Sequence, residues 1–490
     1  MLRFEKSKGI TVVTVASLFA VAAPAFADDA TSASTPSTSN SASASASANP
    51  SDLDQRVRVL ERQLEIQQEK ADASAKNSAV VTAGSDGFKI KSADGEYSLE
   101  LHALVQADGR FYLQGENSTT SDQFLLRRVE PTLSGNLGKY VGFTITPEFG
   151  NSSATTPTSS AASPTSNLLD YYIDLRFDPA ATLRVGRYKE PVGLENLQPS
   201  SAITFIERGL AIDLEPNRDI GAQLQGKLLN NTLSYAVGIF NGAADGGDAP
   251  QGNYDNHFDV AARLFVEPFR NSPGLFQGLG VGVAGTRGAA DEPLSALSAE
   301  LIASSGGKYV STGQLPIFTY SSNVYAAGLR THFSPQAYWY HNSFGLLTEY
   351  VTSTQTLSNS TTTTRLTHSA YQATASYVLT GDDASYTGVK PRHPFRIGSD
   401  GWGAFEIAAR VSGLNIDSRV FDDKFAAPSA GGGVVAGARE YGAAANWYLN
   451  GNTKLSLNYE DSHFRNAPGA TAAQTRPDER AVLLQAQIYY

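Results

Sequence analysis

The chain has 490 residues, no cysteine, a single methionine and a net charge of −10 at pH 7. The lack of cysteine excludes disulfides, thiolate metal sites and cysteine nucleophiles, and the acidic balance argues against a nucleic-acid partner. Mean hydropathy is slightly polar although Tyr, Phe and Gly are abundant. A membrane β-barrel gives this balance because half of its strand residues face water.

The N-terminus has the pattern of a secretory signal peptide, which we predict over 1–27. Basic residues precede an apolar stretch over 10–26, and this stretch ends in the small-residue cleavage motif Ala25-Phe26-Ala27. The apolar run is too short for a comfortable membrane helix, and no later segment offers about 20 continuous apolar residues. We therefore expect an exported chain without a helical anchor.

Three short segments are expected between the signal and the main fold. Residues 28–51 consist largely of Ser, Ala and Thr and are predicted to be a linker. In 52–76, Leu53, Val57, Leu60 and Leu64 follow 4-3-4 spacing with charges on the other faces, which predicts a short coiled coil. A single solvated helix is the alternative. Residues 77–96 are expected to be a second linker.

From 97 to 490 the sequence alternates outward apolar with inward polar residues in sixteen segments. In the first of them, Leu99 and Leu101 alternate with Glu100 and His102, and a slip of one residue would place the charges in lipid. Each segment is long enough to cross the apolar band as a tilted strand. The second strand has outward Val129, Pro131 and Leu133 and inward Arg128, Glu130 and Thr132, and it lies between the links at 114–122 and 138–139. The other fifteen strands are expected near 97–112, 141–149, 169–177, 181–188, 219–228, 231–240, 256–268, 278–287, 323–333, 337–352, 366–380, 401–414, 437–449, 453–463 and 479–490.

The connections alternate between short and long, which predicts the direction of the barrel. The short links fit periplasmic turns at 138–139, 179–180, 229–230, 334–336 and 450–452. The long links fit extracellular loops at 114–122, 150–167, 189–218, 241–255, 288–322, 353–365, 415–436 and 464–478. Two periplasmic links, 269–277 and 381–400, are unusually long. The fold class predicted is all-β: a sixteen-stranded antiparallel transmembrane β-barrel, usually a pore, preceded by a short N-terminal coiled-coil helix.

Several motifs follow one another along the predicted barrel: FLLRRVEP at 124–131, GRYKEPVGLE at 186–195, Glu207-Arg208, NRDIG at 217–221, LTGD at 379–382 and WGAFEIAAR at 402–410. Together they resemble the motifs of the phosphate-selective porin O and P family. Their order and spacing cover about 90 to 490, which is the whole predicted barrel. The resemblance implies a homotrimer, an inward-folded loop at 189–218 that narrows each pore, and a lumen whose basic side chains guide anions.

Basic residues at inward positions are the candidate anion-binding residues. Arginine suits phosphate because its planar fork gives bidentate, charge-assisted hydrogen bonds. Arg176 and Arg184 flank one short turn and are expected to form a basic pair near the periplasmic mouth. The inward loop adds Lys189, Arg208 and Arg218. The predicted register also places in the lumen Arg110, Arg128, Arg263, Arg410 and Lys454.

Acidic residues are as common as basic ones at the inward positions. The same register gives ten lumen acids against seven bases, so structural ion pairs are the alternative role for each arginine. The acids are Glu100, Asp108, Glu130, Glu148, Asp170, Asp174, Asp259, Glu267, Glu406 and Glu460. Preference for phosphate therefore comes from the resemblance alone.

The expected function is an outer-membrane porin that passes small anions, with phosphate or polyphosphate as the expected solute. A general or sugar-type diffusion pore is one alternative, with Tyr112 and Tyr172 as possible stacking groups. An envelope tether, in which the N-terminal coiled coil contacts the cell wall from the periplasm, is another. No histidine lies in an H-E-x-x-H motif and the chain has no G-x-S-x-G, so we expect no enzyme activity, no metal and no cofactor.

Overall fold

The computed structural model describes residues 50–84, 87–113, 121–150, 167–249, 253, 256–290, 308–359, 361–428, 433–470 and 475–490. The predicted signal peptide, the linker up to residue 49 and most of the predicted loop 150–167 lie outside these residues. So do parts of the loops predicted at 114–122, 241–255, 288–322, 353–365, 415–436 and 464–478. The chain forms two compact units, 1–69 and 70–490.

One long helix, α1 (Pro50–Asn77), covers the segment predicted to be a coiled coil. Ion pairs one turn apart support it, with Arg58 2.7 Å from Asp54 and Arg62 2.9 Å from Glu65. Val57, Leu60 and Leu64 of the apolar seam are exposed, and the pairing of this seam with other helices stays a prediction. Among the described residues, no helix is long and apolar enough to cross a bilayer.

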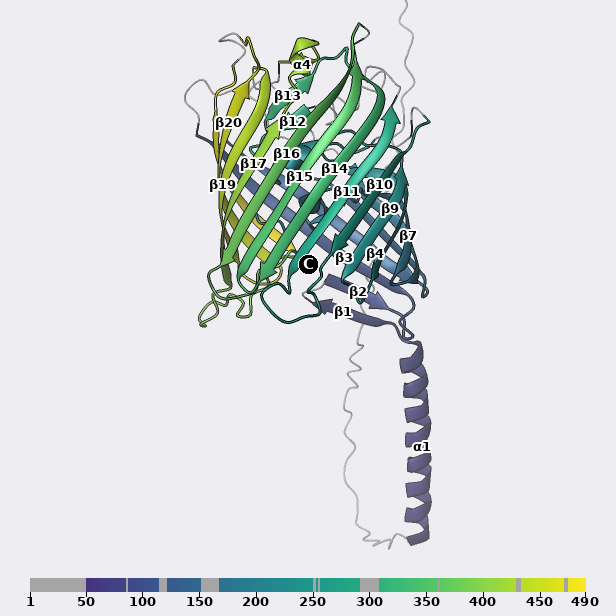
Figure 1. Ribbon diagram of the computed structural model, residues 1–490. Helices are drawn as coiled ribbons and strands as arrows, with labels where there is room; N and C mark the ends of the chain where they lie inside the picture. The colour runs from purple at the N-terminus through teal and green to yellow at the C-terminus, as the bar shows by residue number, and fades with distance from the viewer. Residues whose placement is uncertain are drawn as a thin grey trace, which may run out of the picture. The chain divides into compact units, whose positions relative to one another are not determined.

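Sixteen antiparallel strands of the described residues close into a barrel (Figure 1), which confirms the predicted fold class. Pairing of the last strand with the first, from Tyr489–Leu104 to Ala481–Tyr112, closes the wall. The strands are β3 (Ser98–Tyr112), β4 (Gln123–Leu137), β5 (Val141–Glu148), β6 (Asn167–Asp178), β7 (Ala181–Lys189), β8 (Arg218–Leu228), β9 (Leu233–Phe240), β10 (Asp259–Val266), β11 (Leu279–Ala290), β14 (Tyr325–His341), β15 (Phe344–Ser358), β16 (Thr363–Val378), β17 (Ala404–Asn415), β19 (Val435–Tyr448), β20 (Thr453–Asn466) and β21 (Glu479–Tyr489).

A small hairpin lies within 77–96, where the sequence predicted only a linker. It consists of β1 (Val80–Gly84) and β2 (Gly87–Lys91), and β2 pairs with β3 from Ser98 to Leu101. The last strand, β21, reaches β3 only from Leu104 onward. The hairpin therefore covers an edge of β3 that would otherwise be left unpaired.

One predicted turn is wrong. The sequence placed it at 334–336, but β14 runs through these residues and turns at Asn342 and Ser343. Pro335 lacks an N–H, and the pairing of β14 with β15 skips it, while the pairing with β11 continues across Pro335. β15 ends at Ser358 and β16 begins at Thr363, so the predicted loop 353–365 shrinks to the few residues between them.

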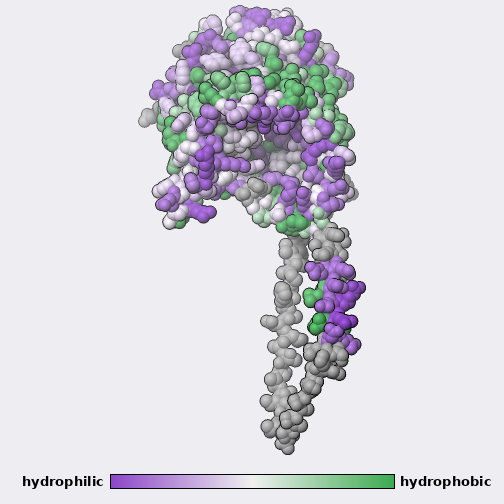
Figure 2. Space-filling view, turned by 60° about the horizontal axis from the view of Figure 1, so that its bottom comes forward, coloured by the Kyte–Doolittle hydropathy of each residue, from purple (hydrophilic) through white to green (hydrophobic). Residues whose placement is uncertain are grey.

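The outer face of the wall is apolar, as the predicted alternation requires. Leu99, Leu101, Ile173 and Val185 are between 42% and 51% exposed on it, and Figure 2 shows hydrophobic residues gathered across the part of the wall that is in view. The same view shows a hollow at the short-turn end, bordered by hydrophilic residues. The wall therefore has an apolar exterior, and many of its inward positions carry polar side chains such as Gln106 and Asp108.

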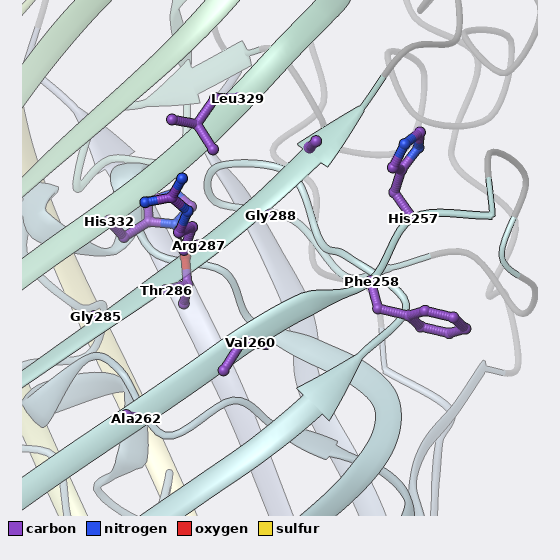
Figure 3. Close-up of a pocket in the computed structure, with 11 residues that line it drawn as sticks. His257, Phe258, Val260, Ala262, Gly285, Thr286, Arg287, Gly288, Leu329 and His332 are labelled. Carbon is purple, nitrogen blue, oxygen red and sulfur yellow. Dashed lines mark hydrogen bonds between the residues drawn. The ribbon is translucent and has the colours of Figure 1, made fainter.

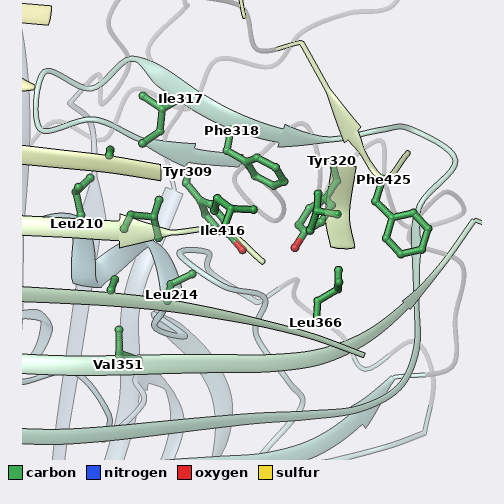
Figure 4. Close-up of a cluster of buried hydrophobic side chains, with 14 of the residues drawn as sticks. Leu210, Leu214, Tyr309, Ile317, Phe318, Tyr320, Val351, Leu366, Ile416 and Phe425 are labelled. Carbon is green, nitrogen blue, oxygen red and sulfur yellow. The ribbon is translucent and has the colours of Figure 1, made fainter. Parts of the chain in front are cut away.

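Connections from the long-loop end fill part of the interior (Figure 4). They carry β12 (Lys308–Val310), β13 (Pro316–Tyr320), α4 (Arg419–Asp422) and β18 (Ala426–Ala427), and the three strands form a small sheet. Their side chains form a hydrophobic core with inward apolar residues of β15, β16 and β17. Members of this core are Tyr309, Ile317, Phe318, Tyr320, Val351, Leu357, Leu366, Leu414, Ile416, Val420 and Phe425.

The long link between β16 and β17 fills the same side from the short-turn end. Tyr386 donates a hydrogen bond of 2.6 Å to the carbonyl of Leu194. Ala384 and Val389 pack against Val378 and Tyr448 of the wall. The half of the barrel formed by β14–β19 is thus packed from both ends.

Candidate functional site

The constriction segment, residues 190–217, connects β7 to β8 and runs through the inside of the barrel. It contains a short helix, α2 (Leu194–Leu197), and a 3-10 turn, η1 (Leu210–Leu214). The turn packs against β15, β16 and β17 on the opposite wall. The N–H groups of Leu194 and Glu195 donate to Glu349 of β15 at 2.6 and 3.3 Å. The segment therefore spans the lumen from one wall to the other.

Side chains of the wall hold the middle of this segment through its backbone carbonyls. Each donor comes from a different strand, and buried carbonyl groups require such partners. The bonds are Gln106 to Ser200 (3.3 Å), Gln487 to Ser201 (3.0 Å), Lys454 to Ile203 (2.9 Å), Asn446 to Thr204 (2.9 Å) and Arg410 to Glu207 (2.7 Å). The path of the segment is thus fixed residue by residue.

Glu207 is the ionic anchor of the segment. Arg127 donates two hydrogen bonds to its carboxylate, at 2.6 and 2.9 Å, and Arg110 donates a third at 2.6 Å. Burial alone would raise the pKa of the Glu207 carboxyl, but the charges of Arg127 and Arg110 bring this pKa far below its ordinary range. Glu207 therefore stays ionised inside the barrel.

Arg127 enters the lumen because β4 carries a β-bulge. Gln106 pairs with Arg128, but the next residue of β3, Ala107, pairs with Leu126. The extra residue allows two consecutive arginines to face inward. The sequence prediction missed Arg127; its signal is the Arg127-Arg128 pair itself, since strict alternation would place one of the two charges in lipid.

A lumen basic cluster forms where the constriction segment leaves and rejoins the wall. Its members are Arg127, Arg128, Lys189, Arg208 and Arg218. Arg218 makes an ion pair of 2.9 Å with Asp170, and Arg128 lies 2.6 Å from Gln106 and 3.7 Å from Glu130. Lys189 is close enough to Arg208 and Arg218 to interact electrostatically with both. The structure thus brings together four predicted residues and the missed Arg127.

Lys189 and Arg208 differ from the rest of the cluster in their partners. Lys189 donates to the carbonyl of Asn196 at 2.6 Å, and Arg208 donates to those of Glu195 and Gln198 at 2.9 Å each. Within the described part of the chain, neither has a carboxylate within 4.0 Å. Burial lowers the pKa of Arg208, the Glu195 carboxylate raises it, and Arg218 lowers it again. The charged groups of Lys189 and Arg208 are therefore hydrogen-bonded to neutral carbonyl oxygens.

The other predicted residues are engaged elsewhere. Arg184 and Arg176 do lie together, but Asp174 lies between them, at 2.8 and 3.9 Å. Arg184 also stacks on Tyr172 at 3.8 Å. The two arginines therefore lie side by side as predicted, and Asp174 gives them the ion-pair partner named as the alternative role of the lumen arginines.

Arg110, Arg410 and Arg263 do not join the cluster as open cations. Arg110 and Arg410 are buried and bonded to carboxylates, the latter 3.0 Å from Glu460, so they support the constriction segment instead of facing a solute. Arg263 lies on β10, 2.9 Å from Gln336 and over the ring of Phe265. All three side chains therefore point inward as predicted, but they lie outside the lumen basic cluster.

Exposure of inward residues differs between the two halves of the barrel. All inward residues of β16 from Leu366 to Val378 are buried. On β4 and β6, by contrast, inward Glu130, Thr132 and Asp170 stay partly exposed. The open side of the lumen therefore runs along the β4–β8 wall, where the lumen basic cluster lies.

A separate hollow lies in the wall at β10, β11 and β14 (Figure 3). Behind it, His332 bonds Thr286 at 2.6 Å and Asp245 at 2.8 Å, and Ser353 also donates to Asp245, at 2.9 Å. These bonds tie the loop after β9 to the wall. No group of three acidic or histidine side chains in the described residues is placed to hold a metal ion.

A family model for the phosphate-selective porin O and P matches residues 99–490. The chain belongs to the phosphate-selective porin O and P family. It is therefore a porin, a channel-forming β-barrel of the outer membrane, as predicted from the motifs.

Solved structures of other outer-membrane channels are similar to this porin in fold. The outer membrane channel DcaP of Acinetobacter baumannii has a TM-score of 0.50 and 10% identity, over 82% of this chain and 99% of that one. An anion-selective porin from Comamonas acidovorans has a TM-score of 0.47 and 12% identity, over 81% and 100%. Identities this low show the fold alone. No curated protein matches the chain.

Proposed function

We propose that this porin conducts small anions along the β4–β8 side of its lumen, with phosphate-class oxyanions preferred. The observation that carries the proposal is the pair of Lys189 and Arg208, whose charges are held by carbonyl oxygens of the constriction segment. A pore selects ions by its width and by the charge at its narrowest part. Cations without a carboxylate partner can accept a passing anion without first breaking an ion pair.

Arg128 and Arg218 support this pair from the wall. Their carboxylate partners, Glu130 and Asp170, stay partly exposed on the open side. A multiply charged oxyanion benefits from several donors at once because each charge-assisted hydrogen bond is stronger than a neutral one. A lumen with this arrangement attracts phosphate more strongly than chloride.

The orientation proposed follows from the connections. Long loops face the cell exterior and short turns face the periplasm, and the N-terminal segment that contains α1 is assigned to the periplasm. Its exposed seam of Val57, Leu60 and Leu64 fits a parallel coiled coil in a homotrimer. Contact of this helix with the cell wall is the tether alternative. Deleting 28–76 separates the two: loss of envelope integrity with normal conductance favours the tether.

The test of anion binding is a planar bilayer recording in chloride with added phosphate. We expect phosphate to block chloride current, with half-block at about 1 mM, which corresponds to about −4 kcal/mol of binding free energy. The variant Lys189→Gln with Arg208→Gln should lose the block. The matched control, Arg270→Gln with Arg392→Gln, changes two exposed arginines and should keep it.

A general diffusion pore is the second candidate, since acids outnumber bases in the predicted lumen. Liposome swelling distinguishes it from the first. Rapid swelling in neutral sugars, together with absence of phosphate block, would favour the general pore. Slow swelling with block at low phosphate would favour the anion pore.

A further inference from the structure

A polar cluster lies on the outer face of the barrel, toward the long-loop ends of β16, β17, β19 and β20. The register places Tyr371, Gly413, Arg439 and His463 side by side in one row. Arg465 belongs to the next row toward the long loops, where it pairs with Gly437. These residues alternate with buried inward neighbours, so they face away from the lumen.

Two glycines shape the surface of this cluster. A Cβ atom at Gly413 would lie 2.5 Å from the ring of Tyr371, and one at Gly437 would lie 2.9 Å from a guanidinium nitrogen of Arg465. Tyr371 and Arg465 therefore lie across the glycine backbones. The glycines hold the two side chains close to the wall, on either side of Arg439.

The guanidinium groups of Arg439 and Arg465 have only neutral partners in the described residues. Arg439 interacts with the hydroxyls of Tyr371 and Tyr441. Arg465 donates to the carbonyl of Ala436 at 2.9 Å and to Asn415 at 3.4 Å. Both guanidinium groups are exposed, so each keeps donors that can face an anion.

Two acids, Asp461 and Asp478, lie at the edge of the cluster and contact its histidine, His463. Asp461 lies 3.4 Å from Arg480 and 3.5 Å from His463, and Asp478 lies 2.7 Å from His463. Among the described residues, neither carboxylate lies within 4.0 Å of the guanidinium group of Arg439 or Arg465. An anion from outside the chain is the complement that this surface lacks.

The cluster lies at the border of the apolar band. Along β19, the outward residues toward the short-turn end are Tyr441, Ala443, Ala445 and Trp447, and Arg439 is the first outward charge beyond them. A transmembrane barrel places its apolar band in the hydrocarbon and its flanking aromatics at the headgroups. Arg439 and Arg465 therefore lie at the depth of lipid headgroups, where the available anions are phosphates.

We propose that Arg439 and Arg465 form a docking site for the phosphate group of an anionic lipid in the outer leaflet. Tyr371 and Tyr441 flank the phosphate at the edge of the apolar band, and the acyl chains lie against the small residues Ala443 and Ala445. This site is on the opposite face of the wall from the lumen basic cluster. It does not depend on the selectivity of the pore.

The test measures lipid binding to the full-length porin in non-ionic detergent by native mass spectrometry. The probe is a bisphosphorylated glucosamine-disaccharide lipid, compared with the same lipid after removal of its phosphates and with inorganic phosphate. We expect the phosphorylated lipid to bind, and Arg439→Gln with Arg465→Gln to weaken its binding by about 10-fold or more, because charge-assisted hydrogen bonds are lost. The matched control is Arg287→Gln with Arg365→Gln, two other exposed outward arginines.

Unchanged binding in the Arg439→Gln and Arg465→Gln variant would overturn the proposal. Equal loss in the control, or equal binding of the dephosphorylated lipid, would do the same. Dissociation of the lipid-free oligomer by the variant would reassign this face to a contact between copies. Channel conductance and block by phosphate should stay unchanged, which shows that the barrel is folded. If the glutamine variant fails to fold, Arg439→Lys with Arg465→Lys should give an intermediate loss.

Discussion

Arg127 of β4 and Glu207 of the constriction segment form a two-bond ion pair inside the barrel, at 2.6 and 2.9 Å. The pair exists because the β-bulge at Arg127 redirects that side chain from lipid to lumen. Arg110 binds the same carboxylate from β3. One carboxylate thus joins the constriction segment to two wall strands, next to the residues that we propose to attract anions.

Removing Arg127 should loosen this junction. In Arg127→Ala the buried Glu207 carboxylate keeps only Arg110, and breaking a buried pair in this way costs about 3–5 kcal/mol. We expect a lower unfolding temperature in detergent and larger current fluctuations in bilayers. Arg270→Ala, which breaks an exposed pair with Glu267, should cost about 1 kcal/mol or less. Equal stability of the two variants would contradict the role of Arg127.

Stability should fall as pH rises because of Glu215. Burial, together with Glu349 and Glu195, raises the pKa of the Glu215 carboxyl well above its ordinary value, and Arg208 opposes this only in part. The folded state therefore binds more protons than the unfolded state at pH values above the ordinary carboxyl pKa of about 4.3. We expect Glu215→Gln to be more stable than the native chain at pH 8, with a smaller difference at pH 5.

Glu207, on the same segment, should change the stability with pH in the opposite direction to Glu215. Its pKa is lowered, so its ionised form stabilises the fold above the ordinary carboxyl pKa, and this contribution is lost as pH falls. Glu207→Gln should therefore be less stable than the native chain at pH 8. Thermal unfolding between pH 5 and pH 8 measures both variants. Parallel curves for Glu215→Gln and the native chain would contradict a raised pKa of the Glu215 carboxyl.

Gly193 allows the constriction segment to approach Glu215. A Cβ atom at Gly193 would lie 1.7 Å from a carboxylate oxygen of Glu215, so Gly193→Ala requires the segment to shift. Overpacking of this kind costs about 1–3 kcal/mol, and we expect altered single-channel conductance as well. Gly451→Ala is the control, since nothing lies within 4 Å of its Cβ position. Native-like conductance in Gly193→Ala would mean that the segment is less tightly placed than described.

The hydrophobic core inside the barrel should support stability more than selectivity. Phe318 is 1% exposed within this core and stacks on Tyr309, and Phe→Ala in a core costs about 3–5 kcal/mol. Phe318→Ala should therefore lower the unfolding temperature while the reversal potential stays unchanged. A marked change in ion selectivity would show that the β14–β19 half conducts.

The sequence was sufficient for the barrel because membrane strands have a strict pattern. One face must be apolar and the other polar, so strand number and side-chain direction follow from alternation, as Leu99 and Glu100 illustrate. The ends of the strands were predicted less accurately than their number. Outward threonines of β15 beyond the apolar band look like loop residues, and Pro335 looks like a turn although β14 continues through it.

Contacts between distant segments were beyond sequence reasoning. The bulge at Arg127 is a matter of pairing between β3 and β4, and the carboxylates that meet Arg110, Arg184 and Arg410 depend on how the chain closes. The packing of 308–324 into the lumen was likewise hidden, because its apolar residues meet β15–β17 only after the barrel forms. The alternation of polar and apolar residues predicts which way each side chain points, but the residues that it contacts depend on the three-dimensional structure.

The most direct test of the central claim is the reversal potential in a KCl gradient for the native porin and for Lys189→Glu with Arg208→Glu. We expect the native channel to give an anion-directed potential, and the double variant to shift it toward cations, because the carbonyl-held charges at the constriction are reversed. A potential near zero in the native channel, or the same potential in both, would contradict the proposal that Lys189 and Arg208 set the selectivity of the pore.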